Sequence, residues 1–259
     1  MELSQKCIIN EYHLWNDIDK LNTSIPEDNK ELMPGVKWGC FSRLYTPAYW
    51  KMQYFLHNQE DNHCVNYKLG DNVLEEVVAC LLGGFGMKSE LGLAAFNRLK
   101  NRRQIIAGVD FTSILNSLSE PFFLGFKMVH YRFPNQKAKF ITEFLNRKDL
   151  NRIPIQCDLT FRKWLLSING IGPKTASWIT RNFLDSENVA IIDVHILRAG
   201  IIVGLFSRHL DLQKDYFKLE KTFIQFCNAL EVSPSKMDAL MWLQMKESNR
   251  IAINLINNL

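Results

Sequence analysis

A glycine-rich turn between two helical patterns constrains the fold of this chain most strongly. The turn reads Asn169-Gly170-Ile171-Gly172-Pro173-Lys174. Its glycines permit a tight backbone turn, and Pro173 suits the first turn of a helix, where its missing N–H is not needed. Apolar residues recur at helical spacing on both sides of the turn, at Phe161, Trp164, Leu165 and Ile168 and then at Ala176, Ile179 and Phe183. The sequence therefore predicts a helix, a hairpin and a second helix over residues 159–184.

The start of the second helix has the features of an anion site. Backbone N–H groups at a helix start, with no side chain over them, favour a phosphate. Lys174 lies beside this turn and shares a helix face with Trp178 and Arg181, because the three are spaced i, i+4, i+7. An uncharged lysine amine is a nucleophile that can form a Schiff base. Lys174 is therefore a candidate catalytic residue.

A single carboxylate follows the apolar run Val189–Ile192. Asp193 stands before a helical stripe that contains Val194, Leu197 and Ile201. Aspartate is a favoured N-cap, so one interpretation is structural. A carboxylate next to four apolar residues is also costly to bury without a partner or a task. Both roles stay open for Asp193.

The charge distribution favours an anionic partner. The net charge is +4 over 259 residues. Seven cations and two acids lie between Lys127 and Arg152, a local excess of five; the cations are Lys127, Arg132, Lys137, Lys139, Arg147, Lys148 and Arg152. Such a stretch can track nucleic-acid phosphates. It can equally be a solvated helix face.

Several classes of protein are disfavoured by composition. The 47% of apolar residues and 22% of charged residues exclude bulk disorder. No apolar run approaches the roughly 18 residues of a membrane span, and the N-terminus is not that of a signal peptide. The six cysteines form no CxxC pair, and the spacing of His57, His63 and Cys64 is poor for a metal site. We expect reduced thiols and a protein of the cytosol.

The chain divides into an irregular start and a helical body. Residues 1–70 are punctuated by proline and glycine, and we expect them to pack as an N-terminal segment on a body formed by 71–259. Asp71 or Asn72 can cap the first helix of the body, which breaks at Gly83–Met87. Further helices are expected near 88–100, 121–132, 136–146, 159–168, 174–184, 194–205, 213–230 and 234–258. The predicted fold class is all-α.

Two motifs together resemble a known family. The run Leu166-Ser167-Ile168-Asn169-Gly170-Ile171-Gly172-Pro173-Lys174-Thr175-Ala176, followed by Ile192-Asp193-Val194-His195, is similar to the helix-hairpin-helix–GPD DNA glycosylases. Lys174 matches the catalytic lysine of that family, and Asp193 matches its invariant aspartate. The resemblance implies two helical lobes around a DNA-binding cleft. It also implies DNA contacts by Gly170, Ile171 and Gly172, and a phosphate contact by His195.

The resemblance extends outward to about residues 71–245. Asn135-Gln136-Lys137-Ala138-Lys139-Phe140-Ile141 resembles the helix start before the hairpin in the oxoguanine branch, which implies DNA contacts by Lys137 and Lys139. Phe85 and Met87 lie where the family inserts a wedge into the base stack. Ser233–Leu243 is similar to a late helix of the archaeal GO glycosylases, in which the counterparts of Asp238 and Trp242 contact the extruded base. Trp178 is a candidate pocket wall.

Structural roles compete with these assignments, and the chain departs from the family in places. Aromatic and methionine side chains are more often core than wedge, His195 can be a core histidine, and Asp238 can favour the positive end of its helix. Residues 1–70 do not fit the extra β-domain of the eukaryotic oxoguanine type, and the four-cysteine cluster of the endonuclease III branch is absent. Trp178 is larger than the small residue often found at its position, which leaves the excised base open.

The resemblance implies a DNA glycosylase that flips out a modified base, 8-oxoguanine first of all, and attacks with a lysine, with β-elimination nicking the strand. One alternative is a glycosylase for an alkylated or hypermodified base, for example in defence against foreign DNA. Another is a non-catalytic DNA-binding module. We expect a monomer that acts on double-stranded DNA without a membrane or cofactor, apart from a structural monovalent cation at the hairpin. The expected compartment is the prokaryotic cytoplasm with its nucleoid, or a eukaryotic nucleus.

Overall fold

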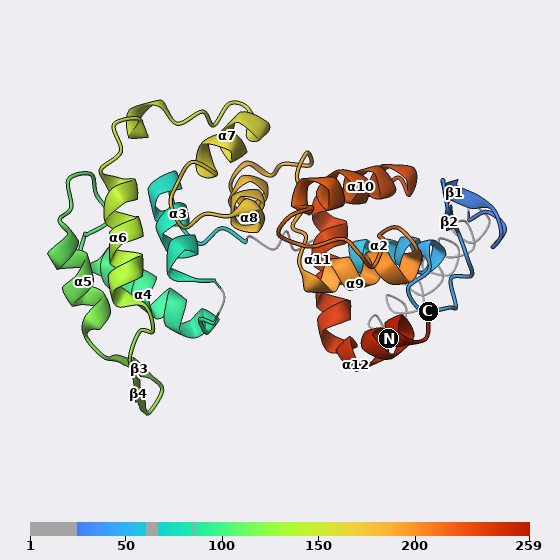
Figure 1. The fold of residues 1–259 in the computed structure, drawn as a ribbon, viewed down its shortest axis with the longest axis horizontal. Helices are drawn as coiled ribbons and strands as arrows, with labels where there is room; N and C mark the ends of the chain where they lie inside the picture. Colours follow the sequence, from blue (N-terminus) through green and yellow to red (C-terminus); the bar gives the residue numbers. More distant parts are fainter. Residues whose placement is uncertain (1–24, 61–66, 85) are drawn as a thin grey trace, which may run out of the picture. The chain divides into compact units, whose positions relative to one another are not determined.

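The computed structural model describes residues 25–60, 67–84 and 86–259, and this part of the chain is mostly helical (Figure 1), as the all-α prediction requires. The helices are α2 (Pro47–Glu60), α3 (Val73–Leu82), α4 (Ser89–Asn101), α5 (Phe111–Ser119), α6 (Pro134–Leu145), α7 (Asp158–Leu165), α8 (Pro173–Leu184), α9 (Val194–Val203), α10 (Tyr216–Ala229), α11 (Pro234–Glu247) and α12 (Asn249–Asn257), with a short 3-10 helix η1 (Leu150–Arg152). Two antiparallel hairpins pair β1 (Glu31–Met33) with β2 (Val36–Lys37) and β3 (Phe122–Leu124) with β4 (Lys127–Val129).

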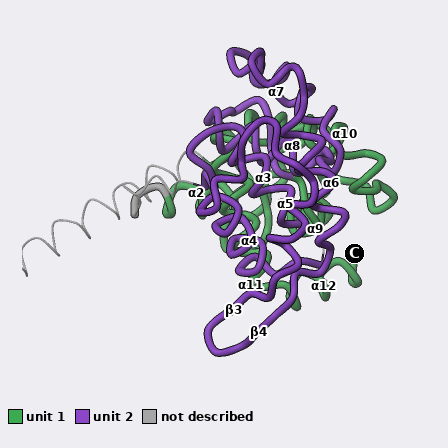
Figure 2. The backbone as a smooth tube through the Cα atoms, turned by 90° about the vertical axis from the view of Figure 1, so that its left-hand side faces the viewer, with its two compact units in different colours: residues 1–64, 192–259 green, residues 65–191 purple. Residues whose placement is uncertain are grey.

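The chain forms two compact units, coloured separately in Figure 2. Unit 1 combines residues 1–64 with 192–259, and unit 2 is residues 65–191. These units are defined by the packing of the chain, whereas the predicted domains, 1–70 and 71–259, are defined by sequence composition. That earlier division into domains stays a prediction.

Unit 2 is built around α3. Asn72 caps this helix by accepting a hydrogen bond from the Glu75 N–H at 3.1 Å, as the sequence predicts. The apolar side of α3 is fully buried, with Val77 and Leu81 at 0% exposure. α3 packs against α4, α6 and α8, while α5 packs on α6 and α7 on α8. The central helix therefore joins the hairpin region to the rest of the unit.

Unit 1 joins the two ends of the described chain. α9 packs against α11 and α12, and α2 packs against α11. The Tyr49 hydroxyl on α2 donates to the Gln244 side-chain oxygen on α11 at 2.8 Å, and Trp50 is completely buried. The expectation of irregular structure throughout residues 1–70 is therefore wrong for Pro47–Glu60. The reason is the core position of its aromatic side chains, which the punctuation by proline and glycine conceals.

The helix expected near 121–132 is also wrong, because β3 and β4 form a hairpin there. The pairs are Phe122↔Val129, Phe123↔Met128 and Leu124↔Lys127. Gly125 at the turn has φ of +60°, a conformation that glycine adopts at little cost. Aromatic and β-branched residues favour strands, which explains the preference for a hairpin over a helix.

Helix boundaries elsewhere are close to the expected ranges, with two exceptions. The sequence pattern predicts no helix at Phe111–Ser119, where α5 starts from the cap Asp110. The single helix expected over 234–258 is two helices, because the backbone breaks at Ser248. No helix within the described ranges combines the length and the apolar character needed to cross a membrane.

Candidate active site

Residues 166–172 form the turn between α7 and α8, where the sequence predicts the hairpin. Gly170 has φ of +90°, and a Cβ atom there would lie 2.5 Å from Cδ2 of Phe140. The side chains of Ile168 and Ile171 are buried, and the Ile171 N–H donates to the Ile168 carbonyl at 3.1 Å. Position 170 therefore requires glycine for its backbone conformation and for its space.

Gly172 leaves the start of α8 open. It is the N-cap residue, it is exposed, and an added Cβ atom would meet no heavy atom within 4 Å. Pro173 follows as the first helical residue. The first N–H groups of a helix lack intrahelical partners and carry its positive end, so an open backbone here suits an anion. The phosphate contact by the hairpin stays a prediction, and this geometry favours it.

The helix face that carries Lys174 runs from solvent into the interior of unit 2. Lys174 is exposed, Trp178 is half-buried, and Arg181 is 6% exposed. The Trp178 ring lies edge-on to Tyr67 with centroids 6.4 Å apart. The Arg181 guanidinium lies 5.7 Å from the centroid of Trp178 and 5.4 Å from that of Tyr67. Sequence reasoning missed Tyr67, because no local pattern links it to α8.

Trp178 also carries an unsatisfied donor. Its indole Nε1 is buried and has no hydrogen-bond partner among the residues that the structure describes. A buried donor left unpaired costs about 1–3 kcal/mol, so such groups are often completed by a ligand or by water. This feature supports Trp178 as part of a binding pocket, a role that stays a prediction.

α6 places the two predicted DNA-contacting lysines differently. Lys137 is partly buried and donates to the Gly83 carbonyl at 3.1 Å, and burial lowers the pKa of its ammonium group. Lys139 is exposed and forms an ion pair with Glu143 at 3.9 Å. Glu143 also accepts a hydrogen bond from Asn169 of the hairpin turn at 2.9 Å. Lys139 therefore lies at the surface beside the hairpin.

Arg147, another cation of the basic stretch, is engaged within unit 2. Its guanidinium donates to both carboxylate oxygens of Asp149, at 2.9 and 2.6 Å, and to the Ser167 carbonyl at 3.1 Å. Trp164 of α7 donates to the same carboxylate at 2.8 Å. These bonds join the end of α6 to the start of the hairpin. Arg147 therefore has a structural role within unit 2.

The Gly83–Met87 break follows α3, as predicted. Gly84 and Gly86 have positive φ, and the Met87 N–H donates to the Gly84 carbonyl at 3.1 Å. Met87 is half-buried and packs against the core of unit 2. Phe85 lies outside the described residues. The wedge role of these two residues stays a prediction.

In unit 1, Asp193 is the N-cap of α9. Its Oδ1 accepts hydrogen bonds from the N–H groups of His195 at 2.8 Å and Ile196 at 3.1 Å. The residue is 8% exposed. The cap predicted from the sequence is therefore confirmed, and a catalytic role for the same carboxylate stays a prediction.

His195 and Trp242 come together where α9 packs against α11. Their rings are edge-to-face with centroids 6.5 Å apart, and the Lys246 ammonium lies 4.6 Å from the centroid of Trp242. His195 Nδ1 is buried without a hydrogen-bond partner in the described part of the chain. Trp242 remains 41% exposed, so it is not a core tryptophan. Lys246 was not anticipated, although it follows Trp242 by one turn.

Asp238 lies one turn before Trp242 on α11 and is 2% exposed. A carboxylate this deeply buried requires polar partners. The two residues share a helix face by spacing, but Asp238 is the interior end of that face and Trp242 the exposed end. Base contacts by Asp238 and Trp242 stay predictions.

The described side chains contain no group of three or more His, Cys, Asp or Glu placed to hold a metal ion. Of the residues considered for a metal in the sequence, His63 and Cys64 lie outside the described ranges.

Comparison with known proteins identifies a family. A family model described as 8-oxoguanine DNA glycosylase matches residues 59–232. A relative from Metallosphaera sedula, named 8-oxoguanine DNA glycosylase/AP lyase, is 36% identical over 127 residues, which are 45% of this chain and 59% of that protein. The chain thus spans about three-fifths of the length of this relative.

Two solved structures share the fold. The 8-oxoguanine DNA glycosylase of Thermotoga maritima aligns with a TM-score of 0.56 at 22% identity, covering 77% of this chain and 97% of that one. The 8-oxoguanine glycosylase/lyase of Methanocaldococcus jannaschii, solved in complex with DNA containing 8-oxoguanine, aligns with a TM-score of 0.50 at 20% identity, covering 78% and 91%.

Proposed function

Because the chain belongs to the 8-oxoguanine DNA glycosylase family, we propose that it excises 8-oxoguanine from double-stranded DNA and can nick the strand afterwards. The observation that carries the proposal is the exposed Lys174 at the first turn of α8, directly after the open hairpin. A phosphate-binding module needs the hairpin and could use Asp193 as a helix cap, but it has no use for the combination of a nucleophilic amine and a carboxylate. That combination favours the enzyme over a non-catalytic DNA-binding module.

The proposed partner is a duplex with one modified base, bound by a monomer. The N–H groups of Gly170 and Gly172 bind phosphate at the start of α8, and the Ile171 N–H, which donates to the Ile168 carbonyl, holds the turn between them. Lys139 of α6 adds positive charge beside the hairpin, Lys137 adds it at the Gly83 carbonyl, and His195 contacts a phosphate near the target. Extruding one nucleotide costs a few kcal/mol, which these backbone contacts offset.

In the proposed reaction, the side-chain nitrogen of Lys174 attacks C1′ of the deoxyribose. The glycosidic bond breaks, and the base leaves with its electron pair and takes up the proton that the attacking amine releases. Positive charge develops on the sugar, and the Asp193 carboxylate stabilises it. Opening of the sugar ring gives a Schiff base between Lys174 and C1′. Loss of a C2′ proton then allows β-elimination, which breaks the bond between C3′ and its oxygen.

Base recognition is assigned to the Trp242 ring, the Asp238 carboxylate and Trp178. The exposed face of Trp242 provides a stacking surface for a purine. Asp238 accepts hydrogen bonds from the N1–H and the N2 amino group, a donor pair that guanine derivatives have and adenine lacks. Trp178 forms a pocket wall with its unpaired Nε1 donor. The size of this indole is the reason to keep alkylated or hypermodified bases as a second candidate.

No organic cofactor enters this reaction, and a structural monovalent cation is proposed at the hairpin. The carbonyls of Ser167 and Ile168 accept hydrogen bonds from Arg147 and Ile171. Each carbonyl oxygen has a second lone pair, so both can still take part in cation binding. The enzyme would act in the compartment that holds chromosomal DNA, a nucleoid or a nucleus.

A panel of duplexes, each with one modified base, tests the assignment. We expect rapid excision of 8-oxoguanine and slower excision of hypoxanthine, which lacks the N2 amino group. Excision of an alkylated adenine or a modified pyrimidine, with 8-oxoguanine untouched, would overturn the base assignment but leave the glycosylase. Binding without excision of any base would instead favour the non-catalytic module.

Asp238→Ala provides a second test of base recognition. The preference for 8-oxoguanine over hypoxanthine should fall by about 1–3 kcal/mol, the scale of a lost base-edge hydrogen-bond pair. Single-turnover rates on both substrates measure this preference, and thermal melting of the variant controls for the loss of a buried carboxylate. An unchanged preference in a folded variant would remove Asp238 from the pocket.

A further inference from the structure

The β3–β4 hairpin carries large apolar side chains that no described residue covers. Phe123 is 73% exposed, Met128 is 60% exposed, and Phe126 at the turn is fully exposed. Phe123 and Met128 are cross-strand partners, so their side chains lie on the same face of the hairpin. Figures 1 and 2 show the hairpin extending away from the helices of unit 2. Contiguous exposed apolar surface of this kind marks a binding site more often than chance.

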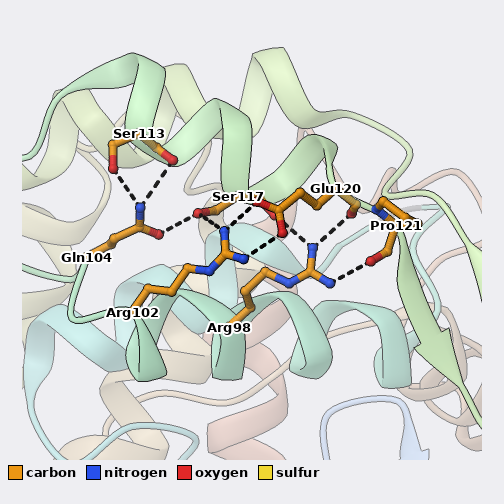
Figure 3. Close-up of polar contacts among 7 residues, drawn as sticks. All are labelled: Arg98, Arg102, Gln104, Ser113, Ser117, Glu120 and Pro121. Atoms are coloured by element: carbon orange, nitrogen blue, oxygen red, sulfur yellow. Dashed lines mark hydrogen bonds and ion pairs between the residues drawn. The ribbon is translucent and has the colours of Figure 1, made fainter.

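The base of the hairpin is held rigidly by α4 (Figure 3). The Arg98 guanidinium donates to the carbonyls of Ser117, Glu120 and Pro121 at 2.9, 2.8 and 2.7 Å. It also lies 3.5 Å from the centroid of the Phe122 ring. The hairpin therefore projects from a fixed base, and a binding partner would not have to order it.

The β3–β4 hairpin is positively charged. From Pro121 to Phe133 the sequence contains Lys127, His130 and Arg132 and no acidic residue. All three basic side chains are exposed. An apolar tip beside the cations Lys127 and Arg132 is complementary to a polyanion with flat apolar faces, the combination that nucleic acids offer.

The residues that follow β4 connect the hairpin to the Gly83–Met87 break. The Tyr131 hydroxyl donates to the Leu82 carbonyl at 2.5 Å, and Arg132 donates to the Gly86 carbonyl at 3.4 Å. The break is the proposed wedge region of the same unit. A duplex held at the break would therefore also pass the hairpin.

We propose that the β3–β4 hairpin is a second duplex-binding element, which contacts nucleotides to one side of the damaged site. Phe123 and Phe126 contact base or sugar faces in a groove, and Lys127 and Arg132 contact phosphates. A two-stranded ribbon fits a DNA groove, and apolar side chains are used by DNA-bending proteins against base steps. This inference rests on the proposed function, because its occupant is the substrate duplex.

The test compares the double variant Phe123→Ser/Phe126→Ser with Ile106→Ser, a control at a 56% exposed apolar residue of the same unit outside the hairpin. Fluorescence anisotropy measures duplex Kd in a Lys174→Gln background, so that the DNA stays intact. We expect the double variant to raise Kd about tenfold, the scale of a lost aromatic contact with a base, and the control to stay within about twofold. Phe126→Ser alone, at a fully exposed position, should show part of the effect.

Duplex length provides an independent readout. Shortening the duplex on one side of the lesion should weaken binding by the parent protein and leave the double variant unaffected. Equal Kd values for parent and double variant at all lengths would overturn the proposal. The proposal would also be overturned if the double variant changed self-association or binding to anionic vesicles rather than duplex binding. The partner of the β3–β4 hairpin would then be a second copy of the chain or a membrane.

The excision assay separates this proposal from the proposed function. A parent protein that excises no base, but binds duplexes in a hairpin-dependent manner, would refute the glycosylase and keep the DNA contact. If the parent excises 8-oxoguanine and the β3–β4 substitutions do not change Kd, the glycosylase is supported and the DNA contact by the β3–β4 hairpin is refuted.

Discussion

Asp193 has a structural role and a proposed chemical role that one substitution separates. Asparagine caps helices about as well as aspartate, so Asp193→Asn should keep both hydrogen bonds to the start of α9 and change the free energy of unfolding by less than about 0.5 kcal/mol. Excision should nonetheless fall by orders of magnitude, because the negative charge is lost. Thermal melting and single-turnover excision measure the two effects. Loss of activity only in proportion to loss of folded protein would make Asp193 a helix cap alone.

Local sequence rules predict some of the candidate residues and miss others. The cap at Asp193 and the placement of Lys174 at the first turn of α8 follow from neighbouring residues, and the structure has both. Tyr67, which packs against Trp178, and Lys246, which lies over Trp242, were not predicted. Tyr67 depends on tertiary packing, whereas the helical spacing of Lys246 from Trp242 would have indicated it.

At the scale of elements, the turn between α7 and α8 offers a matched pair of glycine substitutions. Gly170→Ala should lower the free energy of unfolding by about 2–4 kcal/mol, because alanine is strained at positive φ and its Cβ would clash with Phe140. Gly172→Ala meets open space and should cost less than about 1 kcal/mol. Chemical denaturation compares the two. Equal losses would contradict the assigned roles of the glycines.

The ion pair between Arg147 and Asp149, which lies between α6 and α7, should make the stability of the fold sensitive to acid. The Arg147 guanidinium lowers the pKa of the Asp149 carboxyl from 3.8 to about 2, with help from Trp164. A carboxyl with a depressed pKa stabilises the fold above its unfolded pKa, and this contribution is lost as pH falls from about 4 to about 2. Asp149→Asn should therefore flatten the loss of stability in that window, measured by denaturation at several pH values. Arg147→Met should have the same effect, since it removes the cause, and a loss as steep as that of the parent in both variants would contradict it.

Helices and strands are predicted correctly where the local sequence determines the structure. They are predicted wrongly where packing against distant residues determines it. The boundaries of α3 and α8 follow from the Asn72 cap, the glycines and the apolar spacing, whereas α7 ends at Leu165, before the predicted end at Ile168. The β3–β4 hairpin was mistaken for a helix because short apolar runs are ambiguous between the two. α2 was missed because its aromatic residues are spaced for a core formed with α11, far along the chain.

For the whole molecule, the division into two units could not be predicted from composition. Unit 1 is assembled from both ends of the described chain, through bonds such as those of Tyr45 with Ser248 and Tyr49 with Gln244. Nothing local to Tyr45 or Tyr49 indicates such distant partners.

Borohydride trapping tests the central claim most directly. Reduction converts a Schiff base into a stable bond, so the wild-type protein incubated with an 8-oxoguanine duplex and borohydride should yield a covalent complex that denaturing electrophoresis resolves. Lys174→Gln replaces an exposed side chain, so it should fold, bind the duplex and form no such complex. Trapping that survives in Lys174→Gln would mean that another amine is the nucleophile, and it would contradict the proposed mechanism.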